Sequence, residues 1–288
     1  MPTLDHRPGH LSGALLGILA LAIALAAPLA AQPPTPAAMV REAIQNELHD
    51  DARLFLFAWK ERKNTGTGTL VQDVVETPSG TVSRVVMIDD KPLDSEQLRH
   101  EAERIRKMLD PEQLARKRKE NAEDDERTHR MLSAIPDAFD FVCLDRSLAS
   151  NGHWIAHLKF TPRAGFSPPS REALVFTGMQ GDLLLDENAR RLVKIDGVLF
   201  KDVNFGWGIL GKLYKGGRFV VEKAQVSPSH WETTHMLLHF DGKALLFKSI
   251  HIDDNDSCWN YRPVPPMTTD QAMNFLARQP DQDARLGH

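Results

Sequence analysis

The sequence has few cysteines and no excess of charge of one sign. Two cysteines among 288 residues are too few for a disulfide-dense scaffold or for a zinc site built from cysteines alone. The 35 Lys and Arg residues are nearly balanced by 39 Asp and Glu, which gives a net charge of −4 and a pI near 6.3. A protein that binds the nucleic-acid backbone usually carries a basic excess, so this balance argues against that class.

The chain also lacks a repeat of fixed period. Its hydrophobic content of 42% is close to the globular average, which excludes wholesale disorder and a polytopic membrane protein. At about 150 residues per domain, the length predicts one large domain or two small ones.

An apolar segment without charge, residues 11–31, follows a short head in which Arg7 is opposed by Asp5. Alanines end the segment, and a proline-rich stretch follows at 32–38. This combination is typical of a secretory signal peptide, so we expect cleavage of residues 1–31, a linker and a periplasmic or otherwise exported protein. The alternative is an uncleaved anchor in the inner membrane, because about 20 apolar residues can span a bilayer.

The two cysteines, Cys143 and Cys258, both fall in predicted strands. In an oxidising compartment they can pair across strands. They can equally be two separate buried thiols that behave as small hydrophobic side chains. Both interpretations stay open at this point.

The N-terminal half predicts a helix and then a meander. Residues 39–50 carry apolar side chains at helical spacing. Strand patterns follow at 54–59, 69–76 and 81–88. Short turns containing Gly, Pro and Ser join these strands, so we expect antiparallel pairing.

A charged helical insertion is predicted over residues 94–132. Asp94 and Gln97 have the spacing of a capping box, which favours a helix start. Asp110 followed by Pro111 predicts a second start, with Asp110 as N-cap and Pro111 in the first helical position.

The insertion holds 11 acidic and 10 basic residues between Asp94 and Arg130, so its charge nearly cancels. The basic run 116–119 can be read as a patch for phosphate or lipid headgroups. The acidic run 123–126 beside it favours a solvated helix face instead.

The C-terminal half is dominated by strand patterns, with a short helix near 171–179 and another near 269–278 before a polar tail. Asp241–Gly242 between two such patterns predicts a hairpin turn. We expect a single α+β domain over 39–265, followed by a C-terminal helix and tail over 266–288. The predicted strands are 139–143, 154–160, 181–185, 192–200, 218–226, 233–240 and 243–252.

No catalytic residue, cofactor site or metal ligand is assigned, and we expect a protein that is not an enzyme. Gly206–Gly211 has the spacing G-x-G-x-x-G, but strand patterns surround it and a glycine-rich bend is the better interpretation. The segment Asp253–Ser257 lacks the glycine and distal Glu of a calcium loop, so a polar bulge or turn is expected. No G-x-S-x-G motif is present.

Four histidines keep one metal hypothesis open. His235 and His239 share a face in either a helix or a strand, and His230 or His251 could add a third zinc ligand. No Glu follows His235, so the pattern H-E-x-x-H is absent. The histidines are most simply explained by an ordinary two-sided strand. A histidine-dependent metallohydrolase is kept as the second alternative function.

Several strands are apolar on both faces, which a sheet facing water on one side would not be. The sheet is either covered on both faces by a filled core or curled around an apolar cavity for an acyl chain. The candidate lining residues of such a cavity are Phe55, Phe57, Trp59, Phe139, Phe141, Trp154, Leu158, Phe160, Met236, Leu238, Phe240, Leu246 and Ile250.

Several segments resemble exported bacterial proteins of the LolA/LolB/RseB superfamily, the lipoprotein-carrier fold, over about residues 39–262. The resemblance implies a strongly curved, unclosed antiparallel sheet, or half-barrel, whose concave side is plugged by helices. It implies an apolar cavity for lipoprotein acyl chains and no catalytic residues. The insertion 94–132 departs from the minimal carrier pattern. The segments that carry the resemblance are 136–141, 181–197, 203–211, 219–222, Trp231 and 247–248.

The leading hypothesis is a periplasmic, non-enzymatic protein that binds lipid or the acyl part of a lipoprotein. A carrier needs an apolar void of several hundred cubic ångströms. The alternative is an envelope module without ligand that contacts a protein partner through its charged helix.

Overall fold

The computed structural model describes residues 34–51, 56–64, 68–206, 210–244 and 248–278. The described residues from Thr35 onward form one compact unit. The predicted signal peptide, residues 1–31, lies outside the described residues. Among the helices of the described ranges, none is both long and apolar enough to cross a bilayer.

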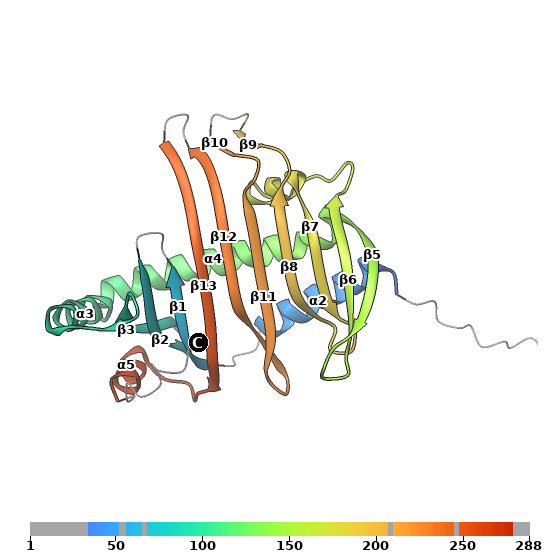
Figure 1. Cartoon of the computed structure of the whole chain (residues 1–288). Coiled ribbons are helices and arrows are strands. Elements are labelled where there is room, and N and C mark those ends of the chain that lie inside the picture. The colour runs from blue at the N-terminus through green and yellow to red at the C-terminus, as the bar shows by residue number, and fades with distance from the viewer. Residues whose placement is uncertain (1–33, 52–55, 65–67, 207–209, 245–247, 279–288) are drawn as a thin grey trace, which may run out of the picture. The chain divides into compact units, whose positions relative to one another are not determined.

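Helices stand at the start, in the middle and at the end of the described chain (Figure 1). They are α2 (Pro36–Asp51), α3 (Ser95–Met108), α4 (Pro111–Ala138), the 3-10 helix η1 (Glu172–Gly178) and α5 (Thr269–Ala277). The strands are β1 (Phe57–Asn64), β2 (Thr69–Thr77), β3 (Gly80–Ile88), β4 (Lys91–Pro92), β5 (Phe139–Leu148), β6 (Trp154–Pro162), β7 (Met179–Asp186), β8 (Arg191–Leu199), β9 (Val203–Phe205), β10 (Gly211–Leu213), β11 (Arg218–Ser227), β12 (His230–Ala244) and β13 (Lys248–Pro263).

All strands belong to one sheet of 13 strands, and every pairing in it is antiparallel. The sheet is not closed, because β4 and β5 end the pairing order. The predicted fold class, α+β with an unclosed antiparallel sheet, is therefore confirmed. The main order is β4-β3-β2-β1-β13-β12-β11-β8-β7-β6-β5, with β9 and β10 added beside β12.

Two hydrophobic cores lie on opposite faces of this sheet. The larger core packs α2, the end of α4 and η1 against the face that carries Phe139, Leu158 and Leu183, which we call the inner face. The smaller core packs α5 against Ala58 and Val75 on the outer face of β1 and β2. Helices thus cover parts of both faces, and not the inner face alone as the resemblance implied.

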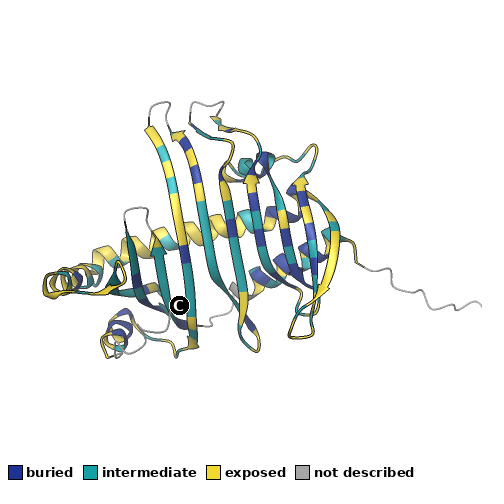
Figure 2. Ribbon diagram, viewed as in Figure 1, coloured by how far each residue is buried: buried dark blue, intermediate teal, exposed yellow. Residues whose placement is uncertain are grey.

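Helix α4 spans the sheet from one side to the other. Its 28 residues correspond to about 42 Å of helix, and the nine strand spacings from β3 to β5 correspond to about 43 Å. The helix contacts β3 near its start and β5, α2 and η1 near its end, whereas residues 122–130 are all exposed (Figure 2). The helix thus contacts the sheet near both of its edges but not between them, which means that the inner face of the sheet is concave beneath it.

The exposed span of α4 is held together by its own side chains. Ion pairs one turn apart join Lys119 to Glu123, Asp124 to Arg127 and Glu126 to Arg130, all of which are exposed. Each such pair contributes about 0.2–0.5 kcal/mol to a helix. These pairs explain how a helix that is polar all round remains helical between its two supported ends.

Both predicted N-caps are confirmed. The Asp94 side chain accepts hydrogen bonds from the backbone of Glu96 and Gln97, and the Gln97 side-chain oxygen accepts one from the backbone N–H of Asp94, which completes a capping box. Asp110 caps α4 with Pro111 in the first turn. The helix ends at Ala138 rather than near residue 132, because its last turn is buried in the larger core.

The predicted hairpin turn at Asp241–Gly242 is wrong. Both residues lie inside β12, where they pair with His251 and Ile250 of β13. Gly242 is needed for a close approach instead: a Cβ there would lie 2.4 Å from the backbone oxygen of Lys212, because β10 pairs at this point. The Asp-Gly pair therefore marks the place where β12 pairs with β10 on one side and with β13 on the other.

The polar bulge or turn predicted at Asp253–Ser257 is also wrong, since these residues continue β13 and pair with β12 without a shift of register. Their polar groups are matched across the sheet. Asp253 accepts from the ring of His239 at 3.2 Å, and Asp256 forms an ion pair with Lys63 at 3.1 Å. Partners on neighbouring strands allow a polar stretch to remain in the sheet.

Candidate functional site

The eleven described candidate lining residues all lie on the inner face, as the alternation along each strand and the pairing registers require. They do not form one group. Phe55 and Leu246 lie outside the described residues. Trp154, at the start of β6, is 48% exposed and takes no part in the core.

One half of the inner face is a filled core. Phe139, Leu158 and Phe160 are at most 1% exposed beneath α2, α4 and η1. The ring of Phe139 lies 4.9 Å from that of Phe160 and 5.3 Å from that of Phe176, measured between centroids. These residues pack against one another and against helices, so they do not line an open cavity.

The other half of the inner face, on β1, β12 and β13, is built differently. Leu238 and Ile252 pack against the larger core, but other inner side chains of these strands belong to neither hydrophobic core, and they mix aromatic, apolar and charged groups. We call this group, which is half-buried except for the buried Asp256, the inner floor: Trp59, Glu61, Lys63, Met236, Asp256, Cys258 and Tyr261.

Aromatic rings form one end of the inner floor. Trp59 stacks on Tyr261 with ring centroids 5.6 Å apart, and Phe57 meets Tyr261 edge-on. The Tyr261 hydroxyl donates to the backbone oxygen of Thr233 at 2.6 Å. The indole N–H of Trp59 is buried and has no acceptor within the described part of the chain.

Charged groups form the centre of the inner floor. Lys63 lies 3.2 Å from Glu61 and 3.1 Å from Asp256, and Gln72 donates to Glu61. Burial lowers the pKa of Lys63, but the attraction of Glu61 and Asp256 outweighs burial and raises this pKa above its ordinary value. The lysine therefore remains a cation at neutral pH.

Cys258 lies between these groups, and burial together with the charge of Glu61 raises its pKa to about 11. Cys143 stands on β5, with five strands between it and β13, and both thiols are free. At pH 8 a thiol with a pKa near 11 is about one-thousandth thiolate, and only the thiolate is nucleophilic.

We therefore expect Cys258 to react slowly with iodoacetamide at pH 8. Peptide mapping after a time course will measure its alkylation in the folded protein and in 8 M urea, where the same thiol serves as its own control. Urea should increase the rate of alkylation of Cys258 at least ten-fold. Equal rates in both conditions would contradict a buried thiol.

The outer face carries histidines that are paired with carboxylates or, for His235, with an amide oxygen. His157 lies between Asp182 at 2.9 Å and Asp145 at 3.2 Å. His251 contacts Asp241 at 2.7 Å, and His235 contacts Asn255 at 2.9 Å. Within the described ranges, no group of three His, Cys, Asp or Glu residues is arranged to hold a metal ion.

The hydrogen bond to Asp182 raises the pKa of His157, with a smaller contribution from Asp145. NMR titration of the ring protons should give a pKa above 6.5, and Asp182→Asn should lower it. Since the folded-state pKa is raised, any stabilisation by this group is present at low pH and lost as pH rises through that pKa. Asp253→Asn, beside His239, is the matched control and should leave His157 unchanged.

Two hollows of several hundred cubic ångströms are lined by residues of α4 and not by the predicted cavity residues. One, of about 740 Å³, lies where α3 meets α4, and the other, of about 530 Å³, lies between the end of α4 and the segment before η1. Their lining is mostly charged or polar, which differs from the apolar void expected for a carrier.

Sequence reasoning missed the charged centre of the inner floor. The strand predicted at 54–59 is β1 at Phe57–Asn64, so Glu61 and Lys63 were not placed in the sheet. The signal that could have found them is the alternation of charge in β1, which matches acidic residues in β2 and β13.

No protein-family model and no curated protein matches the chain. Among solved structures, a DUF1329 family protein from Desulfovibrio piger aligns with 9% identity over 80% of this chain and 94% of its own, at a TM-score of 0.26. MucB in complex with MucA(peri) aligns with 10% identity over 77% and 98%, at a TM-score of 0.19. Scores this low assign neither a family nor a function to the chain.

Proposed function

We propose that this protein is a non-enzymatic binding protein of the cell envelope that holds a lipid, or the acyl part of a lipoprotein, on its inner floor. The contrast between the two halves of the inner face carries this proposal. Helices fill the half around Phe139, whereas Trp59 and Met236 stay half-buried on the other half. A site for an apolar ligand combines apolar side chains with a small number of placed polar groups.

The Trp59 N–H supports a ligand that carries an ester or amide. A buried indole N–H normally finds an acceptor, and leaving it without one costs about 1–3 kcal/mol. Within the described residues this donor has none. A carbonyl oxygen at the polar end of an acyl ligand would satisfy it.

The charged groups at the centre of the inner floor favour binding of a ligand rather than catalysis. Lys63 is kept protonated by Glu61 and Asp256, so it has no free electron pair to act as base or nucleophile. These groups can orient the polar end of a ligand while the apolar residues hold its chain.

The test combines lipid identification with matched variants. Protein purified from its native envelope is extracted with organic solvent for mass spectrometry, and uptake of a fluorescent fatty acid is titrated. Met236→Glu, which puts a charge on the inner floor, should weaken uptake at least ten-fold, and Trp59→Phe, which removes only the N–H, should weaken it several-fold. Val142→Glu, at a residue 60% exposed on β5, is the control and should bind as the original protein does.

Circular dichroism of each variant separates loss of binding from loss of folding. Absence of co-purified lipid together with absence of fatty-acid uptake by the unmodified protein would refute the proposal.

A second candidate function, contact with an envelope protein, is favoured by the exposed span of α4. Nine consecutive exposed residues, 122–130, present charges of both signs. A photo-crosslinking residue at position 125 should capture one defined partner in the native envelope, whereas the same residue at Val198 on the outer face should not. Equal capture from both positions would argue against this surface.

We also propose that the protein is exported. N-terminal sequencing of the mature protein decides between a cleaved signal peptide, which gives a start after residue 31, and an uncleaved anchor.

A further inference from the structure

The hollow of about 740 Å³ is open to solvent and lies at the elbow between α3 and α4. The last turn of α3 and the first turns of α4 form its walls, with Met108 at the corner between them. The lining residues, which we call the elbow site, are Arg106, Lys107, Met108, Asp110, Glu112, Gln113, Arg116, Lys117 and Glu120.

Four of these side chains are cationic, and most of their charge is not neutralised locally. Arg106, Lys107 and Lys117 form no ion pair with any described residue, and Arg116 bonds to Gln113 and lies 3.8 Å from Glu120. Elsewhere on α4, in contrast, Lys119, Arg127 and Arg130 each have a carboxylate partner. Three cations that form no ion pair with a described residue therefore line one hollow, although Arg99 and Arg118 on the same two helices also form none.

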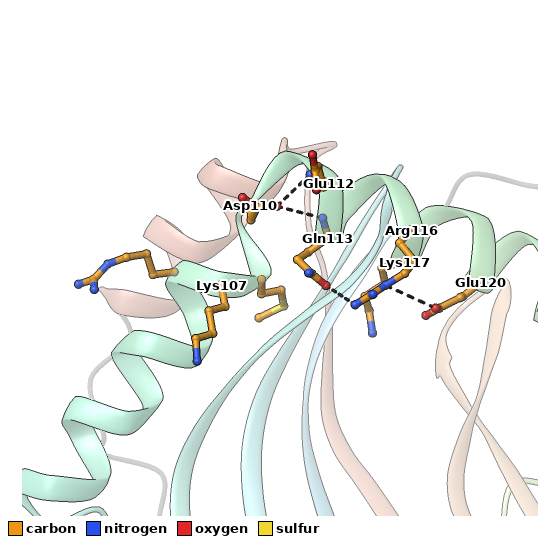
Figure 3. Close-up of a pocket in the computed structure, with 9 residues that line it drawn as sticks. Lys107, Asp110, Glu112, Gln113, Arg116, Lys117 and Glu120 are labelled. Atoms are coloured by element: carbon orange, nitrogen blue, oxygen red, sulfur yellow. Dashed lines mark hydrogen bonds and ion pairs between the residues drawn. The ribbon is translucent and has the colours of Figure 1, made fainter.

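The carboxylates of the elbow do not cancel these cations. Asp110 is occupied as the N-cap of α4, where it accepts from the backbone of Glu112 at 3.0 Å and of Gln113 at 3.2 Å. Figure 3 shows Asp110 and Glu112 on the outside of the elbow, whereas Lys107 and Lys117 lie on the side toward the strands. On that side Glu120 is the acidic group, and it faces Arg116.

We propose that the elbow site binds a phosphate group. Lysine side chains bind phosphate as point charges, and arginine adds a planar pair of donors, so a group with several anionic oxygens matches donors arriving from two helices. The source is either free phosphate or the headgroup of an anionic lipid, which presents the same chemistry. This site is separate from the inner floor and does not depend on the acyl-binding function.

The experiment uses the full chain with two probes. Inorganic phosphate is titrated by calorimetry, and binding to phosphatidylglycerol vesicles is compared with binding to phosphatidylcholine vesicles. Lys107→Gln/Lys117→Gln should weaken binding of the responding probe at least ten-fold. The control Lys119→Gln/Lys159→Gln removes the same charge from a paired position on α4 and from an exposed position on β6, and should change binding less than two-fold.

Each result has one meaning. Binding of inorganic phosphate that only the elbow variant loses supports the site with free phosphate as its ligand. Binding confined to phosphatidylglycerol vesicles, again lost only in the elbow variant, supports a lipid headgroup. Equal loss in both double variants, or no binding of either probe by the unmodified protein, overturns the proposal. Met236→Glu should leave the response unchanged, so failure here and failure of acyl binding are distinguishable.

Discussion

Glu47→Ala is expected to lower the free energy of unfolding by about 3–5 kcal/mol, the cost of breaking a buried ion pair by removing one partner. Glu47 is 5% exposed on α2, and it bonds to Lys223 of β11 and lies 3.9 Å from Arg191 of β8. The side chains of these two cations are 17% and 11% exposed, so alanine removes from a largely buried cluster the carboxylate that Lys223 contacts.

Urea unfolding followed by circular dichroism measures this loss. Glu42→Ala on the same helix is the matched control, because Glu42 forms an exposed ion pair with Arg190 at 2.7 Å. Exposed pairs contribute at most about 1 kcal/mol, so the control should be mild. If both variants lose the same amount, the Glu47 pair does not anchor α2 to the sheet.

Phe139→Ala is expected to destabilise the protein by a similar amount, about 3–5 kcal/mol, as large-to-small changes of buried aromatic residues do. Phe139 is 1% exposed at the junction of α4 and β5. Its ring contacts Phe141, Phe160 and Phe176, which come from two strands and η1. Alanine would leave a cavity at the point where all these elements meet.

Thermal and urea unfolding measure this second effect. Val142→Ala, three residues along the same strand, removes apolar volume from a side chain that is 60% exposed and should stay within about 0.5 kcal/mol. Comparable losses in both variants would mean that the instability comes from the edge strand and not from the filled core.

The helices were the most predictable part of the fold, because their signals are local. The capping box of Asp94 with Gln97 and the Asp110–Pro111 start involve residues at most three positions apart, and both are present. The apolar spacing of residues 39–50 likewise predicts α2, whose buried side includes Val40 and Ile44. The start of α2 at Pro36, three residues before the predicted one, and the end of α4 at Ala138 escaped prediction. Burial in the core extends α4.

The candidate site was predicted in part. Alternation along the strands correctly grouped the described candidate residues on one face. It could not say which of them helices would cover, so Phe139 in the filled core and Trp59 on the inner floor looked alike. The elbow site was predicted only in part: the basic run 116–119 offered a phosphate patch, but the acidic run beside it favoured a solvated face. Lys107 stands ten residues before Lys117, and the two line the same hollow only because of the turn between α3 and α4.

By itself, the sequence determined the α+β class, the antiparallel pairing and the helix starts, since these depend on the period of apolar residues and on groups within one turn of each other. The tertiary structure alone decided that Asp241–Gly242 and Asp253–Asp256 lie within strands, that α5 covers the outer face and that α4 spans the inner one. These outcomes depend on partners far along the chain, such as Lys63 for Asp256, whose charge or close approach outweighs the local preference for a turn.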